Sequence, residues 1–237
     1  MRCRLCNLDG GLKNSHVIPE FVYASLYDDK HRFHVLSTLE GKQNTLEQKG
    51  IREALLCSDC EVQLSKNERY VSLVFSGDIP VKVSKNGRLI HIEGLEYTKF
   101  KLFALSILWR AGVSTLPLFE QVKLGAHEEV LRLMILNNDP GPPEKYPFVL
   151  APVLHEGELQ SDMIIQPSWA RLDGHYAYRF VFGGLAWVFV VSKHRSPPVI
   201  VSASVSRTGK ITMLETEVAN MPFIVNLARE LSENGKL

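Results

Sequence analysis

Four cysteines, arranged as two Cys-x-x-Cys pairs, constrain the fold of this chain more than any other feature. The pairs are Cys3/Cys6 and Cys57/Cys60, so all four cysteines of the 237 residues lie near the N-terminal end. A Cys-x-x-Cys turn directs two thiolates at one ion, and two such turns supply the four ligands that tetrahedral Zn²⁺ prefers. The spacing therefore predicts one structural zinc ion that ties the N-terminal region together.

Two redox motifs or two disulfides are the alternative interpretations of this pattern. A disulfide within Cys-x-x-Cys is strained and usually catalytic, and no thioredoxin-like βαβ pattern surrounds either pair. No apolar run follows the basic residues at the start of the chain, so we expect a cytoplasmic protein. In that compartment paired cysteines more often bind metal than form disulfides.

Composition permits a sizeable core but indicates no particular partner. Hydrophobic residues make up 45% of the chain and charged residues 22%, as is ordinary for globular proteins. The formal net charge is +1, so a contact with nucleic acid would need a local basic patch. The longest apolar stretches, 100–109 and 180–191, are shorter than the ~20 residues of a membrane-spanning helix, and no membrane partner is expected.

The segment between the two cysteine pairs is long enough to fold into elements of its own. Residues 14–19 indicate a short strand that Pro19 stops. Proline also suits the first turn of a short helix over 19–27. Residues 31–36 alternate in part between polar and apolar, as a half-buried strand does. Residues 41–48 are polar and are predicted to form a loop.

The second cysteine pair opens a helix. Apolar residues recur at roughly helical spacing after Cys57, and Gly77 suits the end of that helix. We place a domain boundary directly after this glycine. Residues 1–77 are predicted to form a small zinc-binding module, and residues 78–237 a larger domain of unassigned role.

The larger domain is predicted to combine helices with an antiparallel sheet, which makes the chain an α+β protein. Asn86-Gly87 is a strong hairpin signal between apolar runs at 81–83 and 89–92. Helices are expected at 97–113, 127–136 and 222–231. Further strands are expected at 147–154, 163–165, 176–182, 185–191, 199–205 and 210–214. The last strands are predicted to form a meander that helices cover on one face.

Three motifs of the N-terminal module occur in an order that resembles one known family. They are Cys-Arg-Leu-Cys at residues 3–6, Ser-His-Val-Ile-Pro at 15–19 and Leu-Leu-Cys-Ser-Asp-Cys at 55–60. The module resembles the zinc-stapled members of the HNH, or ββα-metal, nuclease superfamily. The resemblance covers only this region and implies a small ββα fold with DNA endonuclease activity.

The resemblance also implies roles for particular residues. His16 would be the general base that takes a proton from the attacking water. A catalytic divalent ion, Mg²⁺ or Mn²⁺, would stabilise the scissile phosphate, with Glu61 and Glu68 as candidate ligands two helical turns apart. The family often has a metal-binding Asp or His where this chain has Ser15, and no residue here matches its central Asn.

These departures leave two functional hypotheses open. The first is an HNH-like endonuclease whose site is rebuilt around His16, Glu61 and Glu68. The second is a catalytically silent zinc module that binds nucleic acid or a protein partner. His16 would then be a structural residue bonded to backbone, and Glu61 would favour the positive end of the helix dipole. Lys66 and Arg69 are interpreted as a solvated face, whereas a basic edge that would suit a phosphate backbone is expected from Arg2, Arg4, Lys49 and Arg52.

In the larger domain, a few side chains stand out without forming a recognisable motif. Arg110 follows Trp109 at the end of an apolar helix, and we expect it to reach from the core to water; the alternatives are a salt bridge with Glu120 or Glu128, or an anionic ligand. The aromatic residues Trp169, Trp187, Tyr176 and Tyr178 are expected in the core or on a sheet face.

Overall fold

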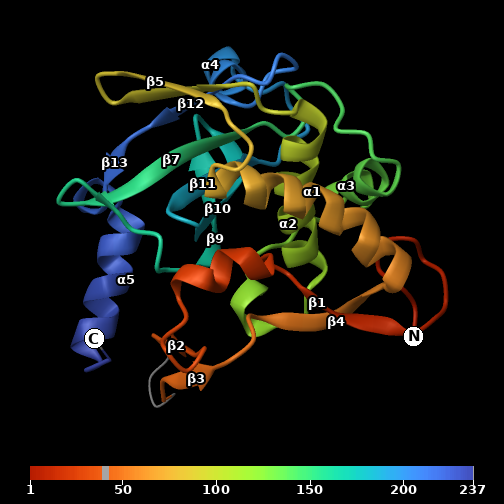
Figure 1. Ribbon diagram of the computed structural model, residues 1–237, viewed down its shortest axis with the longest axis horizontal. Helices are drawn as coiled ribbons and strands as arrows, with labels where there is room; N and C mark the ends of the chain where they lie inside the picture. Colours follow the sequence, from red (N-terminus) through yellow and green to blue (C-terminus); the bar gives the residue numbers. More distant parts are fainter. Residues whose placement is uncertain (39–42, 237) are drawn as a thin grey trace.

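The computed structural model describes residues 1–38 and 43–236 (Figure 1). Its N-terminal part is built on two paired strands and a helix. Strand β1 (Leu12–His16) pairs antiparallel with β4 (Arg52–Cys57), and α1 (Ser58–Ser76) follows β4 directly. Gly77, with φ 83°, ends α1 in the left-handed conformation that its sequence position predicted.

The segment between β1 and β4 forms a short 3₁₀ helix and a small hairpin. The 3₁₀ helix η1 (Glu20–Ser25) begins after Pro19, in agreement with the predicted short helix. Strand β2 (Phe33–Val35) pairs antiparallel with β3 (Thr45–Glu47). The prediction of a loop over 41–48 is therefore wrong for β3, because backbone pairing with β2 suffices to order a polar, exposed strand; residues 41 and 42 lie outside the described part.

The larger sheet joins strands from the middle and the end of the chain. Its order is β5-β6-β12-β7-β11-β10-β9, with β8 and β13 also paired to β7. Most pairs are antiparallel, but β12 and β13 each run parallel to β7. This corrects the predicted meander, since a strand from the C-terminal region inserts between β6 and β7. The bounds are β5 Lys82–Asn86, β6 Leu89–Glu93, β7 Phe148–His155, β8 Glu158–Leu159, β9 Ile165–Leu172, β10 His175–Phe182, β11 Leu185–Val190, β12 Ile211–Leu214 and β13 Thr216–Glu217.

The long helices follow the sequence pattern, whereas one short segment does not. Helices α2 (Tyr97–Val113) and α3 (His127–Leu136) have the predicted bounds, and α5 (Pro222–Glu233) extends two residues further than predicted. The predicted strand over 199–205 is wrong, because α4 (Pro198–Ala203) forms there. Proline at its first position favours a helical start and outweighs the β-branched residues that follow. Short 3₁₀ helices η2 (Pro117–Phe119) and η3 (Val218–Asn220) complete the fold.

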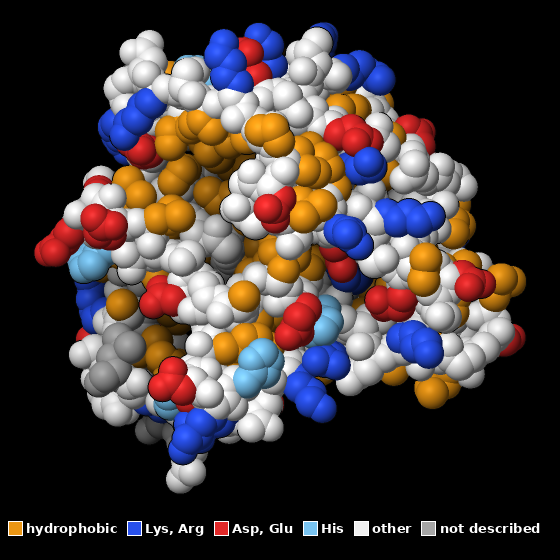
Figure 2. Space-filling model, viewed as in Figure 1, with side chains coloured by type: hydrophobic (Ala, Val, Ile, Leu, Met, Phe, Trp, Pro, Cys, Tyr) orange, Lys and Arg blue, Asp and Glu red, His pale blue; other side chains and the backbone are white. Residues whose placement is uncertain are grey.

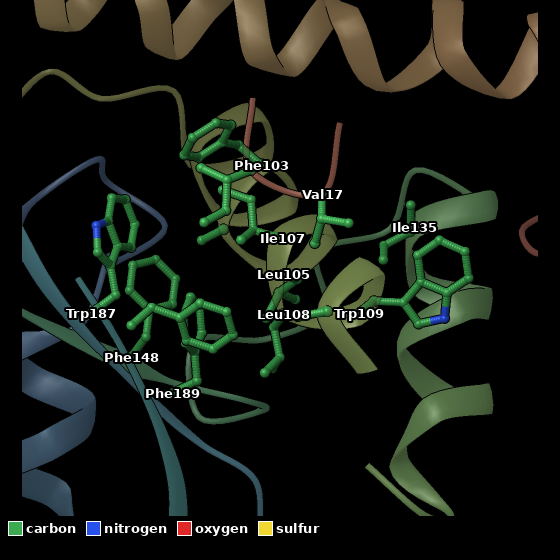
Figure 3. Packing of buried hydrophobic residues seen from close by; sticks show 14 of the residues in the cluster. Val17, Phe103, Leu105, Ile107, Leu108, Trp109, Ile135, Phe148, Trp187 and Phe189 are labelled. Carbon is green, nitrogen blue, oxygen red and sulfur yellow. The ribbon is translucent and has the colours of Figure 1, made fainter. Parts of the chain in front are cut away.

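Helix α2 lies at the centre of the molecule. Every residue from Phe100 to Ala111 is buried, as expected for a helix that is covered on all sides. Figure 3 shows its side chains between Val17 of the N-terminal region, Ile135 of α3, and Trp187 of the sheet. One apolar cluster thus continues from the cysteine region, through α1 and α2, to the large sheet. The domain boundary after Gly77 stays a prediction, which limited proteolysis can test.

In the described part of the chain, no helix has the length and apolar character needed to cross a membrane. A smaller apolar cluster lies beneath α5, where Ile224 and Met221 pack against Val153 and Val181 of the sheet. The sheet therefore carries α5 on one part of its surface and α2 on another, as Figure 1 shows.

Candidate metal centre and the adjoining His16 site

The four cysteines meet at one point of the N-terminal region. Cys3 and Cys6 come from the first loop, Cys57 ends β4, and Cys60 lies in the first turn of α1. Their sulfur atoms all lie within 4.8 Å of one another, and Sγ of Cys6 is 3.8 Å from Sγ of Cys57. In a tetrahedral site with Zn–S bonds of about 2.3 Å, neighbouring sulfurs are ~3.8 Å apart. The cluster could thus hold a structural metal ion such as zinc.

Backbone contacts hold the first cysteine loop against the second. The amide of Cys3 donates to the carbonyl of Leu8 over 3.0 Å, and the amide of Arg4 donates to the carbonyl of Leu55 over 2.9 Å. The Cys57 amide lies 3.3 Å from Sγ of Cys3, the amide-to-sulfur contact that stabilises a thiolate. From α3, the guanidinium of Arg132 donates to the carbonyl of Leu5.

The thiols influence one another because they are so close. Burial raises the pKa of Cys3, but hydrogen bonds from the backbone of Cys6, Cys57 and Leu5 outweigh it and lower that pKa to about 7. Burial and the neighbouring thiols raise the pKa of Cys60. Without a cation, one thiolate therefore suppresses the ionisation of the next. A dication that binds all four removes this conflict.

His16 ends β1, and its imidazole belongs to a chain of three side chains. Nε2 of His16 contacts Oε2 of Glu20, which lies four residues later at the start of η1. The hydroxyl of Tyr27 donates to Oε1 of the same carboxylate over 2.9 Å. Glu20 is therefore held from both sides. Sequence analysis missed Glu20 and Tyr27, although the four-residue spacing from His16 across Pro19 is a signal for the first.

The backbone of His16 is fixed by a buried arginine of α2. Nη1 of Arg110 donates to the His16 carbonyl over 2.6 Å, and Nη2 lies 2.7 Å from Oε1 of Glu68 on α1. Arg110 is only 1% exposed. The expectation that it reaches water or pairs with Glu120 or Glu128 is wrong, because α1 packs against α2 and presents Glu68 to it. Arg110 thus connects β1, α1 and α2 directly behind His16.

Gly50 lies against the edge of the His16 imidazole that carries Cδ2 and Nε2. Its φ is +39°, and a Cβ at this position would lie 3.0 Å from Cδ2 of His16 and 3.0 Å from a ring carbon of Tyr23. The hydroxyl of Tyr23 accepts a hydrogen bond from the amide of Ile51 over 3.1 Å, which anchors the tyrosine. Only a glycine leaves room for both rings, so Gly50 is a positioning residue that sequence analysis missed.

The surroundings favour the neutral imidazole. Burial lowers the pKa of His16 below its ordinary value of 6.5; Glu20 and Glu68 oppose this shift, while Arg52 and Arg110 reinforce it. Its side chain keeps 21% exposure, so water reaches the ring. A neutral, partly hydrated imidazole at pH 7 can accept a proton.

Two hollows open on either side of Glu20. One, of about 390 Å³, is lined by Glu20, Lys30, His31, Gln48, Lys49 and Arg52. The other, of about 320 Å³, is lined by Pro19, Glu20, Phe21, Ser65, Glu68, Arg69, Ser72 and Leu73. The insert between β1 and β4 lies in the lower part of the view in Figure 1, and there Figure 2 shows Lys, Arg and His side chains beside acidic ones. The predicted basic edge thus contributes Lys49 and Arg52 to the first hollow, and Lys30 and His31 join them.

Of the two predicted metal-binding carboxylates, Glu68 lies close enough to His16 to raise its pKa, whereas Glu61 has no such effect on it. Glu68 pairs with Arg110, whereas Glu61 lies seven residues earlier on α1, a separation of about 10 Å along the helix axis. Ser15 is buried, and its hydroxyl donates to the carbonyl of Lys13. Among residues 1–38 and 43–236, the cysteines are the one group of three or more His, Cys, Asp or Glu placed to hold a metal ion.

Comparisons with known proteins add no relative: no family model, curated protein or solved structure matches this chain. The resemblance to HNH nucleases therefore rests on the order of the sequence motifs alone. Function is accordingly inferred from the side chains of this protein alone.

Proposed function

We propose that this protein is a zinc-containing, HNH-like DNA endonuclease whose general base is His16. The observation that carries the proposal is the Tyr27–Glu20–His16 chain beside a hollow lined with cations. A buried structural histidine would be bonded to backbone; this one contacts a carboxylate that is itself held in place. Such an arrangement is typical of a base that a second residue orients.

The proton chemistry follows from which ring nitrogen is engaged. Nε2 of His16 contacts Glu20, and when the proton is on Nε2 the lone pair of the ring lies on Nδ1. In the described part of the chain, no hydrogen bond occupies Nδ1. The Nδ1 lone pair can then take a proton from water as that water attacks phosphorus. The P–O bond to the leaving sugar oxygen breaks, and that oxygen takes a proton from solvent water. The carboxylate of Glu20 stabilises the imidazolium that forms.

The first hollow supplies the binding energy for a phosphodiester. Lys30, Lys49 and Arg52 converge on it from the loop after η1 and from the start of β4. Nη2 of Arg52 lies 3.9 Å from Glu20, close enough for a phosphate bound there to approach His16. Cationic side chains bind phosphate oxygens through charge-assisted hydrogen bonds. Because the net charge of the whole chain is near zero, we expect DNA to be attracted by this local group of cations rather than by the protein as a whole.

The resemblance implies a catalytic Mg²⁺ or Mn²⁺ as well as the zinc. The described residues do not fit that ion well, because Arg110 pairs with Glu68, and Glu61 lies near the cysteines. We therefore assign no step of the reaction to Mg²⁺ or Mn²⁺. Zinc has a different role here, since four thiolates leave no open position for water or substrate.

The alternative function is a silent zinc module that binds DNA or a protein partner. The Arg110–Glu68 pair favours the silent module, because Arg110 occupies a carboxylate that an active metal site would use. The basic hollow serves binding in either case. In the nuclease, Glu20 and His16 are needed for DNA cleavage. In the silent module they contribute only to folding.

Cleavage assays on purified protein separate the two functions. We expect plasmid and oligonucleotide cleavage with Mg²⁺ or Mn²⁺ added, and Glu20→Gln should lower the rate by ~10²-fold or more because it misorients the base. His34→Ala, at an exposed histidine of the same region, is the matched control and should cleave like wild type. DNA binding without cleavage by wild type under any of these ions would favour the silent module.

A further inference from the structure

Two aromatic rings that stack on each other form a solvent-exposed surface at the end of the large sheet. Trp169 of β9 is 54% exposed and Tyr176 of β10 is 41% exposed. Their ring centroids are 6.2 Å apart, and the planes differ by only 8°. The four aromatic residues singled out in the sequence divide into two pairs. Trp187 and Tyr178 are fully buried, whereas Trp169 and Tyr176 are exposed on the sheet.

The surface lies on the last strand pair of the sheet. Tyr176 pairs with Arg171 across the strands, and Trp169 pairs with Tyr178, so all four side chains share one face. Tyr178 lies beside Tyr176 on this face in an edge-to-face contact with centroids 5.4 Å apart. The Tyr178 hydroxyl bonds the backbone of Lys123, which fixes this contact. The two exposed rings are therefore held in place before any ligand arrives.

The charge around this surface is positive, although the whole chain is close to neutral. Residues 174–214 contain five Lys or Arg and no Asp or Glu, although Asp173 directly precedes them. Arg179 lies over Phe223, Arg207 lies over Tyr97 and Lys210 pairs with Glu93, so Lys193 and Arg195 are the two cations of this range that are left for the aromatic surface. Lys193 follows Val191, whose amide donates to the Tyr176 carbonyl over 2.9 Å, and the Arg195 carbonyl bonds the side chain of His175 over 3.2 Å. Arg171, directly across from Tyr176 on the same face, places a third cation beside the rings.

We infer that Trp169 and Tyr176 form a stacking site for the unpaired bases of a single-stranded nucleic acid. Exposed aromatic rings bind bases of any sequence through their faces, while neighbouring cations hold the phosphate backbone. Duplex bases are already stacked and offer the rings no face. This inference deepens the proposed function by naming a single-stranded segment as ligand, but its test involves binding only and needs no cleavage.

Tryptophan fluorescence gives a direct test on the full-length protein in EDTA. Trp109 and Trp187 are 0% exposed, so quenching on addition of a ligand reports mainly on Trp169. We expect a twenty-nucleotide oligothymidylate to quench the emission. An abasic strand with the same number of phosphates should quench far less, because it lacks bases. Equal quenching by the abasic strand would overturn the inference and assign binding to the cations alone.

Variants measured by anisotropy with the same labelled strand complete the test. Trp169→Ala should weaken binding roughly tenfold, whereas Trp169→Phe, which keeps an aromatic face, should lose much less. Tyr176→Leu keeps apolar bulk without the aromatic face and should weaken binding in the same direction. If Trp169→Ala destabilises the hairpin, the folded Tyr176→Leu and Trp169→Phe variants still decide. Binding by Tyr176→Leu and both Trp169 variants equal to that of wild type would contradict the inference.

These outcomes are independent of the His16 site. Loss of cleavage in Glu20→Gln with intact quenching would leave the stacking site in place. Cleavage of duplex DNA by wild type, with no effect of Trp169→Ala on any strand, would reject the stacking site and leave the nuclease. Each result therefore bears on one of the two sites.

Discussion

The cysteine cluster and the His16 site lie in the same region but are built in different ways. The cysteines come from two short turns, and each turn fixes the spacing of its own two ligands. The His16 site needs Glu20 and Tyr27 from the insert, Arg110 from α2 and Gly50 from the approach to β4. In the first, each cysteine pair is local, and a metal ion that binds all four thiolates would join the two pairs across the sequence separation of 51 residues between Cys6 and Cys57. The second depends on packing between parts of the chain that are far apart in sequence.

Loss of a cysteine should produce the largest effect. In Cys57→Ser the site keeps three thiolates, and we expect loss of zinc together with unfolding of β1, β4 and the start of α1, since metal binding and folding are coupled in small zinc sites. Elemental analysis should show about one zinc per wild-type chain and much less in the variant. Hydrogen exchange should rise first in residues 1–77. A folded, metal-free N-terminal region would contradict this.

Removal of Arg110 should have the next largest effect. Arg110→Met leaves Glu68 without its partner and the His16 carbonyl without its donor, and we expect a loss of about 3 kcal/mol in unfolding free energy. This is the low end for a broken buried pair, because Glu68 keeps some access to water. Glu68→Gln, which retains an acceptor for Arg110, should lose less in urea unfolding. Equal losses in the two variants would show that the link to His16 contributes little.

Substitution of Gly50 should have a smaller effect on stability but a specific effect on His16. Gly50→Ala combines an unfavourable positive φ with a methyl group 3.0 Å from the imidazole, and we expect a loss of about 1–3 kcal/mol. The imidazole must shift by a few tenths of an ångström to make room, which changes its contact with Glu20, so we expect the cleavage rate of the folded variant to fall as well. Gly87→Ala, at a positive φ with open space around it, is the matched control. A cleavage loss no greater in Gly50→Ala than in this control would argue against the positioning role.

Acid should produce the smallest and most gradual change. The folded-state pKa of His16 is below 6.5, because burial, Arg52 and Arg110 outweigh Glu20 and Glu68. The unfolded chain therefore binds the proton first as pH falls. The contribution of neutral His16 to stability is complete above about pH 6.5 and is lost as pH falls through the lower folded value. Subtracting the pH–stability profile of His16→Gln from that of wild type should isolate this slope; parallel profiles would contradict it.

The contrast between the two sites also explains how much the sequence could predict. The Cys-x-x-Cys spacing identified all four members of the cluster, and continuous apolar periodicity set the bounds of α2 and α3. Arg110 could not be placed, because its partners lie 42 and 94 residues away in sequence and meet it only through helix packing. Likewise β-branched residues at 199–201 predicted a strand, but the preceding prolines start a helix there.

The test of the central claim is cleavage and thermal unfolding measured together in His16→Ala. The account predicts that the variant keeps one zinc per chain and a near-native melting temperature, while DNA cleavage falls by ~10²–10⁴-fold. A lowered melting temperature with no change in cleavage, or no cleavage by wild type with any divalent ion on single- or double-stranded DNA, would contradict it. In that case His16 is structural, and the module binds without catalysing.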